Sequence, residues 1–177
     1  MRVRSPNSGS AGNGCADMIA DVEVRDAGAR GLGVFALRPF AVGEFIFRRR
    51  HGRVLSYADL PLLSEEDARH LCELDFERCA VLLRPGCYLN HSCEPNAMRS
   101  GVKVFAWRPI QAAEEITIDY RLNAWDEMSR WRCLCRSGSC PGEVIGSFFA
   151  LPPDVQRLYL PWAPPFIRRE YRRRHPR

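Results

Sequence analysis

Short runs in which apolar and polar positions alternate are the main pattern along this chain. Between Ile19 and Arg25, the apolar residues Ile19, Val22 and Val24 alternate with charged ones, as in a half-buried strand. Further strands are expected at residues 34–37, 44–47, 102–107 and 115–120. Glycine and proline turns separate these runs, and the pattern contains no long crossover helix between them. It therefore predicts a mainly β body, β-rich α+β in class, rather than a βαβ arrangement.

Helical spacing of apolar residues occurs at two places. Ser64, with Asp67 three residues later, resembles a capping box, and the apolar residues that follow recur at helical spacing. We predict a helix there, at about residues 64–74. A second helix is expected from Asp154 to Leu160, between two proline-containing segments.

Composition is that of an ordinary globular domain. The chain has 177 residues, 46% hydrophobic and 27% charged, which suits one catalytic-size domain with tails. No apolar run approaches the roughly 18 residues that a membrane-spanning helix needs. Residues 1–14 are rich in Ser, Gly and Asn and lack the apolar segment of a secretory signal, so we expect residues 1–17 to be a disordered leader.

Charge is distributed unevenly around a net value of +5. Acidic residues dominate the segment 56–79, where Arg69 and Arg78 are the basic ones. Arginines crowd into the last ten residues instead. This tail is therefore a candidate contact for phosphate or other polyanions, and weak binding of nucleic acid would be one form of it.

A polar run from Cys87 to Asn96 is the most unusual stretch of the sequence. It reads Cys-Tyr-Leu-Asn-His-Ser-Cys-Glu-Pro-Asn and follows an apolar lead-in. Taken singly, Asn, His and Cys residues in a turn are usually structural. Three other segments change that balance: Arg30–Phe35, which contains Gly-Leu-Gly, the strand Glu115–Tyr120, and a cysteine cluster near residue 135.

The cysteine cluster favours metal binding over disulfides. Cys133, Cys135 and Cys140 have Cys-x-Cys-x4-Cys spacing in a chain without an export signal. They supply three of the four thiolates that a structural zinc site takes, and the alternative is that they are reduced free thiols. Four other cysteines lack such spacing and are expected to be buried or free thiols, namely Cys15, Cys72, Cys79 and Cys87.

In this order, over about residues 22–142, the motifs resemble the SET-domain protein lysine methyltransferases, including their C-terminal zinc-binding post-SET segment. The resemblance implies several short curved sheets with a pseudoknot-like threaded C-terminal segment. It further implies a SET domain at 18–127 with an acidic helical insert at about 56–86, and a zinc segment at 128–146. A helical, Arg-rich extension follows at 147–177. Cys93 is then the fourth zinc ligand.

The resemblance also assigns a cofactor site for S-adenosylmethionine. It implies that the turn Arg30, Gly31, Leu32 and Gly33 approaches the methionine part, while Asn90 and His91 hold the amino and adenine portions. Leu134 is a candidate lid over the adenine. The simpler interpretations stay open: glycines that only turn the chain, a solvated Arg30, and Asn and His residues whose hydrogen bonds are purely structural.

The implied reaction is an in-line attack of a lysine amine on the sulfonium methyl, with the Tyr120 hydroxyl beside it. Tyr88 is a second catalytic candidate, or else a core tyrosine. Ile118 stands where the family carries Phe or Tyr, so we predict tolerance of more than one methylation. The sequence departs from the family at Arg48–His51, where a channel tyrosine is expected, and Tyr57 is the candidate substitute.

These features favour an enzyme that methylates lysine in a basic protein, histone-like or ribosomal, held against the acidic segment. We expect a monomer in the bacterial cytoplasm, with a nuclear or chromatin location as the alternative. Two other functions stay open. One is a non-catalytic zinc-stabilised module that binds nucleic acid through its basic tail, and the other is an inactive SET domain.

Overall fold

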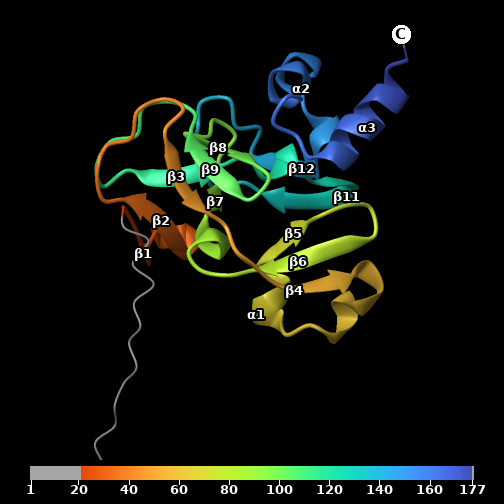
Figure 1. The fold of residues 1–177 in the computed structure, drawn as a ribbon, viewed down its shortest axis with the longest axis horizontal. Coiled ribbons are helices and arrows are strands. Elements are labelled where there is room, and N and C mark those ends of the chain that lie inside the picture. The colour runs from red at the N-terminus through yellow and green to blue at the C-terminus, as the bar shows by residue number, and fades with distance from the viewer. Residues whose placement is uncertain (1–20, 177) are drawn as a thin grey trace, which may run out of the picture.

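The computed structural model describes residues 21–176, which form short strands gathered into four small sheets (Figure 1). The expected mainly β class is thus confirmed. The predicted leader, Cys15 and the start of the first predicted strand lie outside the described residues. Within the described part, no helix combines the length and apolar character needed to cross a membrane.

The central sheet brings together strands from distant parts of the chain. Its order is β1 (Val22–Asp26), β2 (Leu32–Ala36), β10 (Glu115–Ile118) and β7 (Asn90–His91). β10 pairs antiparallel with β2 and parallel with β7, in a register that places Thr117 opposite Asn90 and Ile118 opposite His91. The polar run and the Glu115–Tyr120 segment therefore lie side by side.

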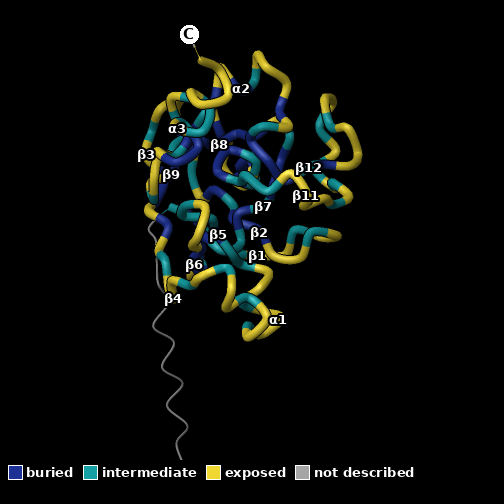
Figure 2. Tube along the Cα trace, turned by 90° about the vertical axis from the view of Figure 1, so that its right-hand side faces the viewer, coloured by how far each residue is buried: buried dark blue, intermediate teal, exposed yellow. Residues whose placement is uncertain are grey.

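A second sheet packs with the central one around the main core. Its order is β3 (Phe45–Arg48), β9 (Lys103–Ala106) and β8 (Ala97–Ser100). β7 and β8 run through the buried interior of the molecule (Figure 2). Val34, Phe40 and Phe47 are among the most buried side chains of this core. Each such side chain contributes roughly 1.5–3 kcal/mol through removal from water, which holds the two sheets together.

The insert is a small sheet rather than a helical segment. Its strands are ordered β4 (His51–Ser56), β6 (Arg78–Leu82) and β5 (Leu71–Glu73). The prediction of a helix over 64–74 was wrong beyond its first turn, α1 (Glu65–Ala68), in which the Ser64 hydroxyl accepts the Asp67 N–H at 3.1 Å. Pairing of β5 with β6 overrides the helical spacing, because three short strands bury their shared face only when they pair.

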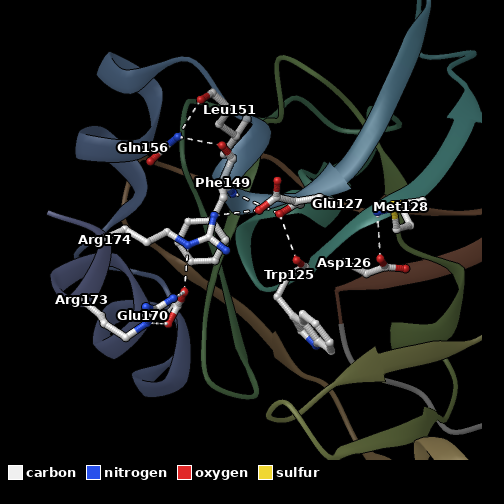
Figure 3. A network of polar contacts seen from close by, with 11 residues as sticks. Trp125, Asp126, Glu127, Met128, Phe149, Leu151, Gln156, Glu170, Arg173 and Arg174 are labelled. Carbon is white, nitrogen blue, oxygen red and sulfur yellow. Dashed lines mark hydrogen bonds and ion pairs between the residues drawn. The ribbon is translucent and has the colours of Figure 1, made fainter.

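The C-terminal part forms a strand pair covered by two helices. β11 (Trp125–Arg132) pairs with β12 (Glu143–Ser147), and α2 (Pro153–Tyr159) and α3 (Pro165–Arg174) follow. The helix expected at 154–160 is α2. Arg174 fastens α3 to β11, because it contacts Glu127 of β11 at 2.7 Å (Figure 3). Its second contact, with Glu170 at 2.8 Å, lies within α3.

Candidate active site and cysteine cluster

The glycine turn before β2 is shaped for close packing. Gly31 has φ 74° and ψ −131°, a conformation that side chains rarely allow. At Gly33, a Cβ atom would lie 2.6 Å from Glu115 Oε1 and 3.2 Å from Asn90 Nδ2. The absence of a side chain at Gly33 therefore lets the strand approach the polar groups of β10 and β7.

Asn90 links the turn to β10. Its Nδ2 donates to the Leu32 carbonyl oxygen at 3.1 Å and to Glu115 Oε1 at 2.7 Å. The other carboxylate oxygen of Glu115 pairs with Arg30. Three segments far apart in sequence are thus joined by one carboxylate. The sequence reasoning missed this role of Glu115, because nothing in a strand pattern marks a residue that bridges two other segments.

A cavity of about 270 Å³ lies between the glycine turn and the cysteine segment. One wall consists of residues 27–30, and the other consists of Leu134, Cys135 and Arg136. Arg30 and Leu134 were both predicted to contact a cofactor, and they line this cavity together. The other residues predicted to contact the cofactor are not among those that line this cavity, namely Gly31, Leu32, Gly33, Asn90 and His91. The cavity therefore brings together two of the seven predicted cofactor residues.

His91 lies buried between the central sheet and the cysteine cluster. Its Nδ1 accepts the backbone N–H of Tyr120 at 3.2 Å, and its Nε2 lies 3.3 Å from Cys93 Sγ. Burial lowers the pKa of His91 to about 4, so the imidazole is neutral at pH 7. With Nδ1 accepting, the ring proton sits on Nε2 and faces the Cys93 sulfur.

Tyr120 presents a neutral phenol at the end of β10. Its hydroxyl donates to the Leu89 carbonyl oxygen at 2.7 Å. The side chain remains 40% exposed overall, while burial of the hydroxyl end raises the pKa of Tyr120 to about 12. The ring contacts His91 and Trp131, with centroids 5.3 and 6.2 Å away. Trp131 comes from β11, and no spacing in the sequence singled it out.

A second cavity, of about 250 Å³, lies beside Tyr120. Ile118, Tyr120 and Leu89 form one wall, and the insert supplies Cys72 and Glu73 on another. Ile118, which was predicted to influence the number of methyl groups added, and Tyr120, which was predicted to be catalytic, therefore line the same cavity. Its position between the central sheet, the insert and β11–β12 makes it the candidate channel for a substrate side chain.

Two predicted tyrosines are not among the residues that line this channel. The Tyr57 hydroxyl instead donates to the Asp75 carbonyl oxygen and accepts from Trp125 Nε1, both at 3.3 Å. Its position does not support the expected replacement of the missing channel tyrosine. Tyr88 packs edge-on against His70 at 5.3 Å and beside the main core, which matches the core interpretation.

At the sequence departure, Arg49 is the residue that fills the space, since it is 3% exposed and lines the channel. Glu73, which the sequence reasoning also missed, accepts the Trp125 backbone N–H at 2.9 Å. Burial raises the pKa of Glu73 to about 8, so this carboxyl is mostly protonated at pH 7. The channel therefore contains titratable groups that the motif pattern did not indicate.

Cys93, Cys133, Cys135 and Cys140 gather at one point. Their Sγ atoms all lie within 4.8 Å of one another. Tetrahedral zinc with bonds of about 2.3 Å places thiolate sulfurs ~3.8 Å apart, so small adjustments would close a zinc site around these atoms. The N–H of Gly142 points to the Cys140 sulfur at 3.4 Å. The four predicted ligands thus come together, and their chemistry fits zinc.

Comparisons with known proteins point to one family. Residues 31–121 match the SET domain family model. A histone-lysine N-methyltransferase, H3 lysine-36 specific, from Eremothecium gossypii is 31% identical over 144 residues, covering 72% of this chain and 21% of its own length. A histone-lysine N-methyltransferase, H3 lysine-4 specific, from Emericella nidulans is 39% identical over 64 residues, covering 31% of this chain and 5% of its own.

Among solved structures, the methyltransferase domain of human histone-lysine N-methyltransferase SETMAR superimposes with a TM-score of 0.55. It is 22% identical, and the match covers 71% of this chain and 58% of that one. At this identity the likeness concerns the fold. The chain spans at most about a fifth of the length of the two curated relatives named above.

Proposed function

Because this chain belongs to the SET-domain family, we propose that it transfers a methyl group from S-adenosylmethionine to the side-chain amine of a lysine in a protein. One observation carries the proposal: the glycine turn, Asn90 and Tyr120 come from separate segments and meet through the pairing of β10 with both β2 and β7. Members of this family named above carry out lysine methyl transfer, which sets the reaction class.

The cofactor would lie along the glycine turn and beneath Leu134, in the cavity these segments share. Arg30, Gly31, Leu32 and Gly33 would form one side, with Asn90 and His91 next to them. S-adenosylmethionine supplies an electrophilic methyl group on a sulfonium. Arg30 is already paired with Glu115, so its role toward the cofactor carboxylate would require sharing that guanidinium.

The lysine amine must lose its proton before it attacks, since the ordinary lysine pKa is about 10.4. A narrow channel that excludes water, next to a cation, penalises the ammonium form and favours the neutral amine. Tyr120 is a poor base because its pKa lies near 12. Its hydroxyl and the Leu89 carbonyl oxygen instead orient the amine, and positioning of this kind accounts for much of a rate enhancement.

Ile118 would limit how the amine is held during repeated transfer. It is buried and lines the channel, and its side chain brings no hydroxyl to retain a water molecule. A methylated amine would therefore meet an apolar wall at this point. We propose that the enzyme adds more than one methyl group, which the product mass resolves.

The protein substrate would be basic. The insert, which also supplies Cys72 and Glu73 to the channel wall, carries an excess of acids that includes Asp59, Glu65, Glu66 and Asp67. Relatives named above are specific for histone lysines, so a histone-like or ribosomal protein is the substrate class proposed. Zinc at the four thiolates would hold residues 133–140 against the cofactor cavity. A bacterial cytoplasmic location stays a prediction.

Charge pairing at the C-terminus weighs against the nucleic-acid alternative. Arg173 and Arg174 of α3 are paired with Glu170, and Arg174 also with Glu127. These arginines are partly neutralised and help to fasten the helix, which lowers their value as phosphate contacts.

The test is a transfer reaction with deuterated methyl donor, histones and ribosomal proteins, read by mass spectrometry. Labelled lysine is the expected product, and Tyr120→Phe should remove it. Binding of S-adenosylmethionine by calorimetry without any labelled product would indicate an inactive SET domain. Salt-dependent nucleic-acid binding without cofactor binding would support the zinc-stabilised module and overturn the proposal.

A further inference from the structure

Cys72 occupies a special position in the insert. It lies in β5, is 6% exposed, and is among the residues that line two neighbouring cavities. One is the channel of about 250 Å³ that also contains Tyr120, and the other measures about 170 Å³ and extends toward Trp162. The same cysteine therefore belongs to the wall of both cavities.

Three N–H donors from three separate segments converge on this sulfur. Arg49 Nη1, Arg99 Nη1 and Asn123 Nδ2 lie 3.5, 3.4 and 3.5 Å from Cys72 Sγ. A neutral thiol is only a weak acceptor. Two buried guanidiniums are costly unless a negative charge lies next to them, and the thiolate of Cys72 is placed to supply it.

The surrounding charges agree with a thiolate. Burial by itself would raise the pKa of Cys72, but the Arg99 charge, the His51 side chain and Arg49 outweigh it and lower this pKa to about 5. Glu73, the next residue, is the nearby carboxyl. It is mostly protonated at neutral pH, so it carries little negative charge and does not compete with the sulfur for pairing with the arginines.

Polar atoms around the sulfur have unused hydrogen-bonding capacity. Within residues 21–176, Arg49 Nε, Arg99 Nε and Asn123 Oδ1 are buried without a hydrogen-bond partner. All three residues line the smaller cavity and are at most 6% exposed. Asn123 Oδ1 is an acceptor, whereas Arg49 Nε and Arg99 Nε are N–H donors. Unpaired buried N–H groups are costly, so an oxygen atom added to the sulfur would offer an acceptor to these two donors.

We propose that Cys72 is a modification site at which a hydroperoxide oxidises a pre-formed thiolate to a sulfenate. The sulfur lone pair attacks one peroxide oxygen, so an S–O bond forms and the O–O bond breaks. Sulfur is oxidised by two electrons, and the other peroxide oxygen leaves as hydroxide, which takes up the proton of the attacked oxygen and becomes water. The arginine donors hold the negative oxygen that results.

The consequence for methyl transfer rests on the proposed function. Cys72 and Tyr120 line the same channel, so an added oxygen narrows it and changes its hydrogen bonding next to the site of transfer. Oxidation of Cys72 therefore lowers methyl transfer. The oxidation itself does not depend on activity and is measured separately.

Cys87 is a matched internal control. It lines the same channel, but burial raises its pKa above the ordinary value. Cys79 is buried, and burial raises its pKa as well. Neither should react with peroxide as a pre-formed thiolate does.

The experiment treats the full-length, zinc-loaded protein with hydrogen peroxide, denatures it in dimedone at set times, and quantifies each cysteine by peptide mass spectrometry. Cys72 should be oxidised at least about tenfold faster than Cys87, with a rate constant that is nearly flat between about pH 6 and 8.5. A Cys72 rate equal to that of Cys87, or one that rises tenfold per pH unit, would overturn the proposal.

Two variants add independent readings. Arg99→Met removes one charged donor and should slow oxidation of Cys72, whereas the exposed Arg130→Met should not. If Arg99→Met does not fold, the pH profile of the natural protein still decides. In the natural protein, peroxide should inhibit methyl transfer in step with the oxidation of Cys72. This part of the inhibition should be absent from Cys72→Ser. Rapid Cys72 oxidation in a protein without transferase activity would refute the proposed function alone.

Discussion

The hydroxyl of Tyr120 and the backbone carbonyl of Leu89 are joined by a hydrogen bond of 2.7 Å. Leu89 immediately precedes Asn90, so this bond fixes the phenol to the segment that also binds the glycine turn. The segment that follows β10 is thereby held by a side chain to the residue that precedes β7, in addition to the pairing of the two strands. A lysine amine in the channel would meet the phenol and the carbonyl oxygen together.

Tyr120→Phe should lower kcat for methyl transfer by about 10²–10³-fold, since one positioned polar group at a reacting centre is typically worth that much. The aromatic packing against His91 and Trp131 stays in place, so affinity for S-adenosylmethionine should change little. Steady-state kinetics and calorimetry separate the two effects. Tyr88→Phe is the control, and an equal loss there would mean that the role of Tyr120 is only structural.

Gly33→Ala should destabilise the fold by roughly 1–3 kcal/mol, because the new methyl group overlaps polar side chains that are bonded to each other. It would meet Glu115 Oε1 at 2.6 Å and Ala27 Cβ at 3.0 Å. Denaturant unfolding measures the change in the free energy of unfolding. Gly138→Ala, where a Cβ meets nothing nearer than 3.8 Å, should leave that free energy within about 0.5 kcal/mol.

Zinc should be present at one atom per chain and should be lost in Cys140→Ser or on treatment with a strong chelator. Elemental analysis measures the metal content. Affinity for S-adenosylmethionine should fall about tenfold or more, because residues 134–136 form one wall of the cavity proposed for this cofactor. Cys79→Ser should retain the metal. A full zinc content in the Cys140 variant would contradict the four-thiolate site.

The pH dependence of stability should report on Glu73. Its pKa is about 8 in the folded protein against an ordinary value of 4.5, so between these values the folded state binds a proton that the unfolded chain does not. The contribution of Glu73 to the free energy of unfolding is therefore fully present below about pH 4.5. It decreases as pH rises from there and is lost as pH rises through 8. Glu73→Gln removes that loss.

The difference in free energy of unfolding, Glu73→Gln minus the natural protein, should thus increase by about 1 kcal/mol or more as the pH is raised from 5 to 8. Urea denaturation at several pH values measures this gain. The exposed Glu77→Gln should show none. A difference between the two proteins that stays constant from pH 5 to 8 would mean that the Glu73 carboxyl is already ionised at low pH.

The motif residues could be picked out because each carries its chemistry in a short local pattern. The structure brings Asn90 against the Gly-Leu-Gly turn and gathers the four cysteines, while the roles of these residues stay predictions. Local spacing failed at 64–74, where helical periodicity gave way to strand pairing. The sequence could not place the Tyr57 side chain either, since no local pattern tells whether a side chain faces the channel or Trp125.

The family, the mainly β class and the grouping of cysteines could be read from the chain alone, because motif spacing and residue type are properties of the chain. Which distant groups meet was settled by folding: Glu115 lies between Arg30 and Asn90, and Arg49, Arg99 and Asn123 surround Cys72. A buried charge depends on neighbours that strand pairing brings together. Because those neighbours lie at no fixed separation along the chain, no pattern in the sequence reveals them.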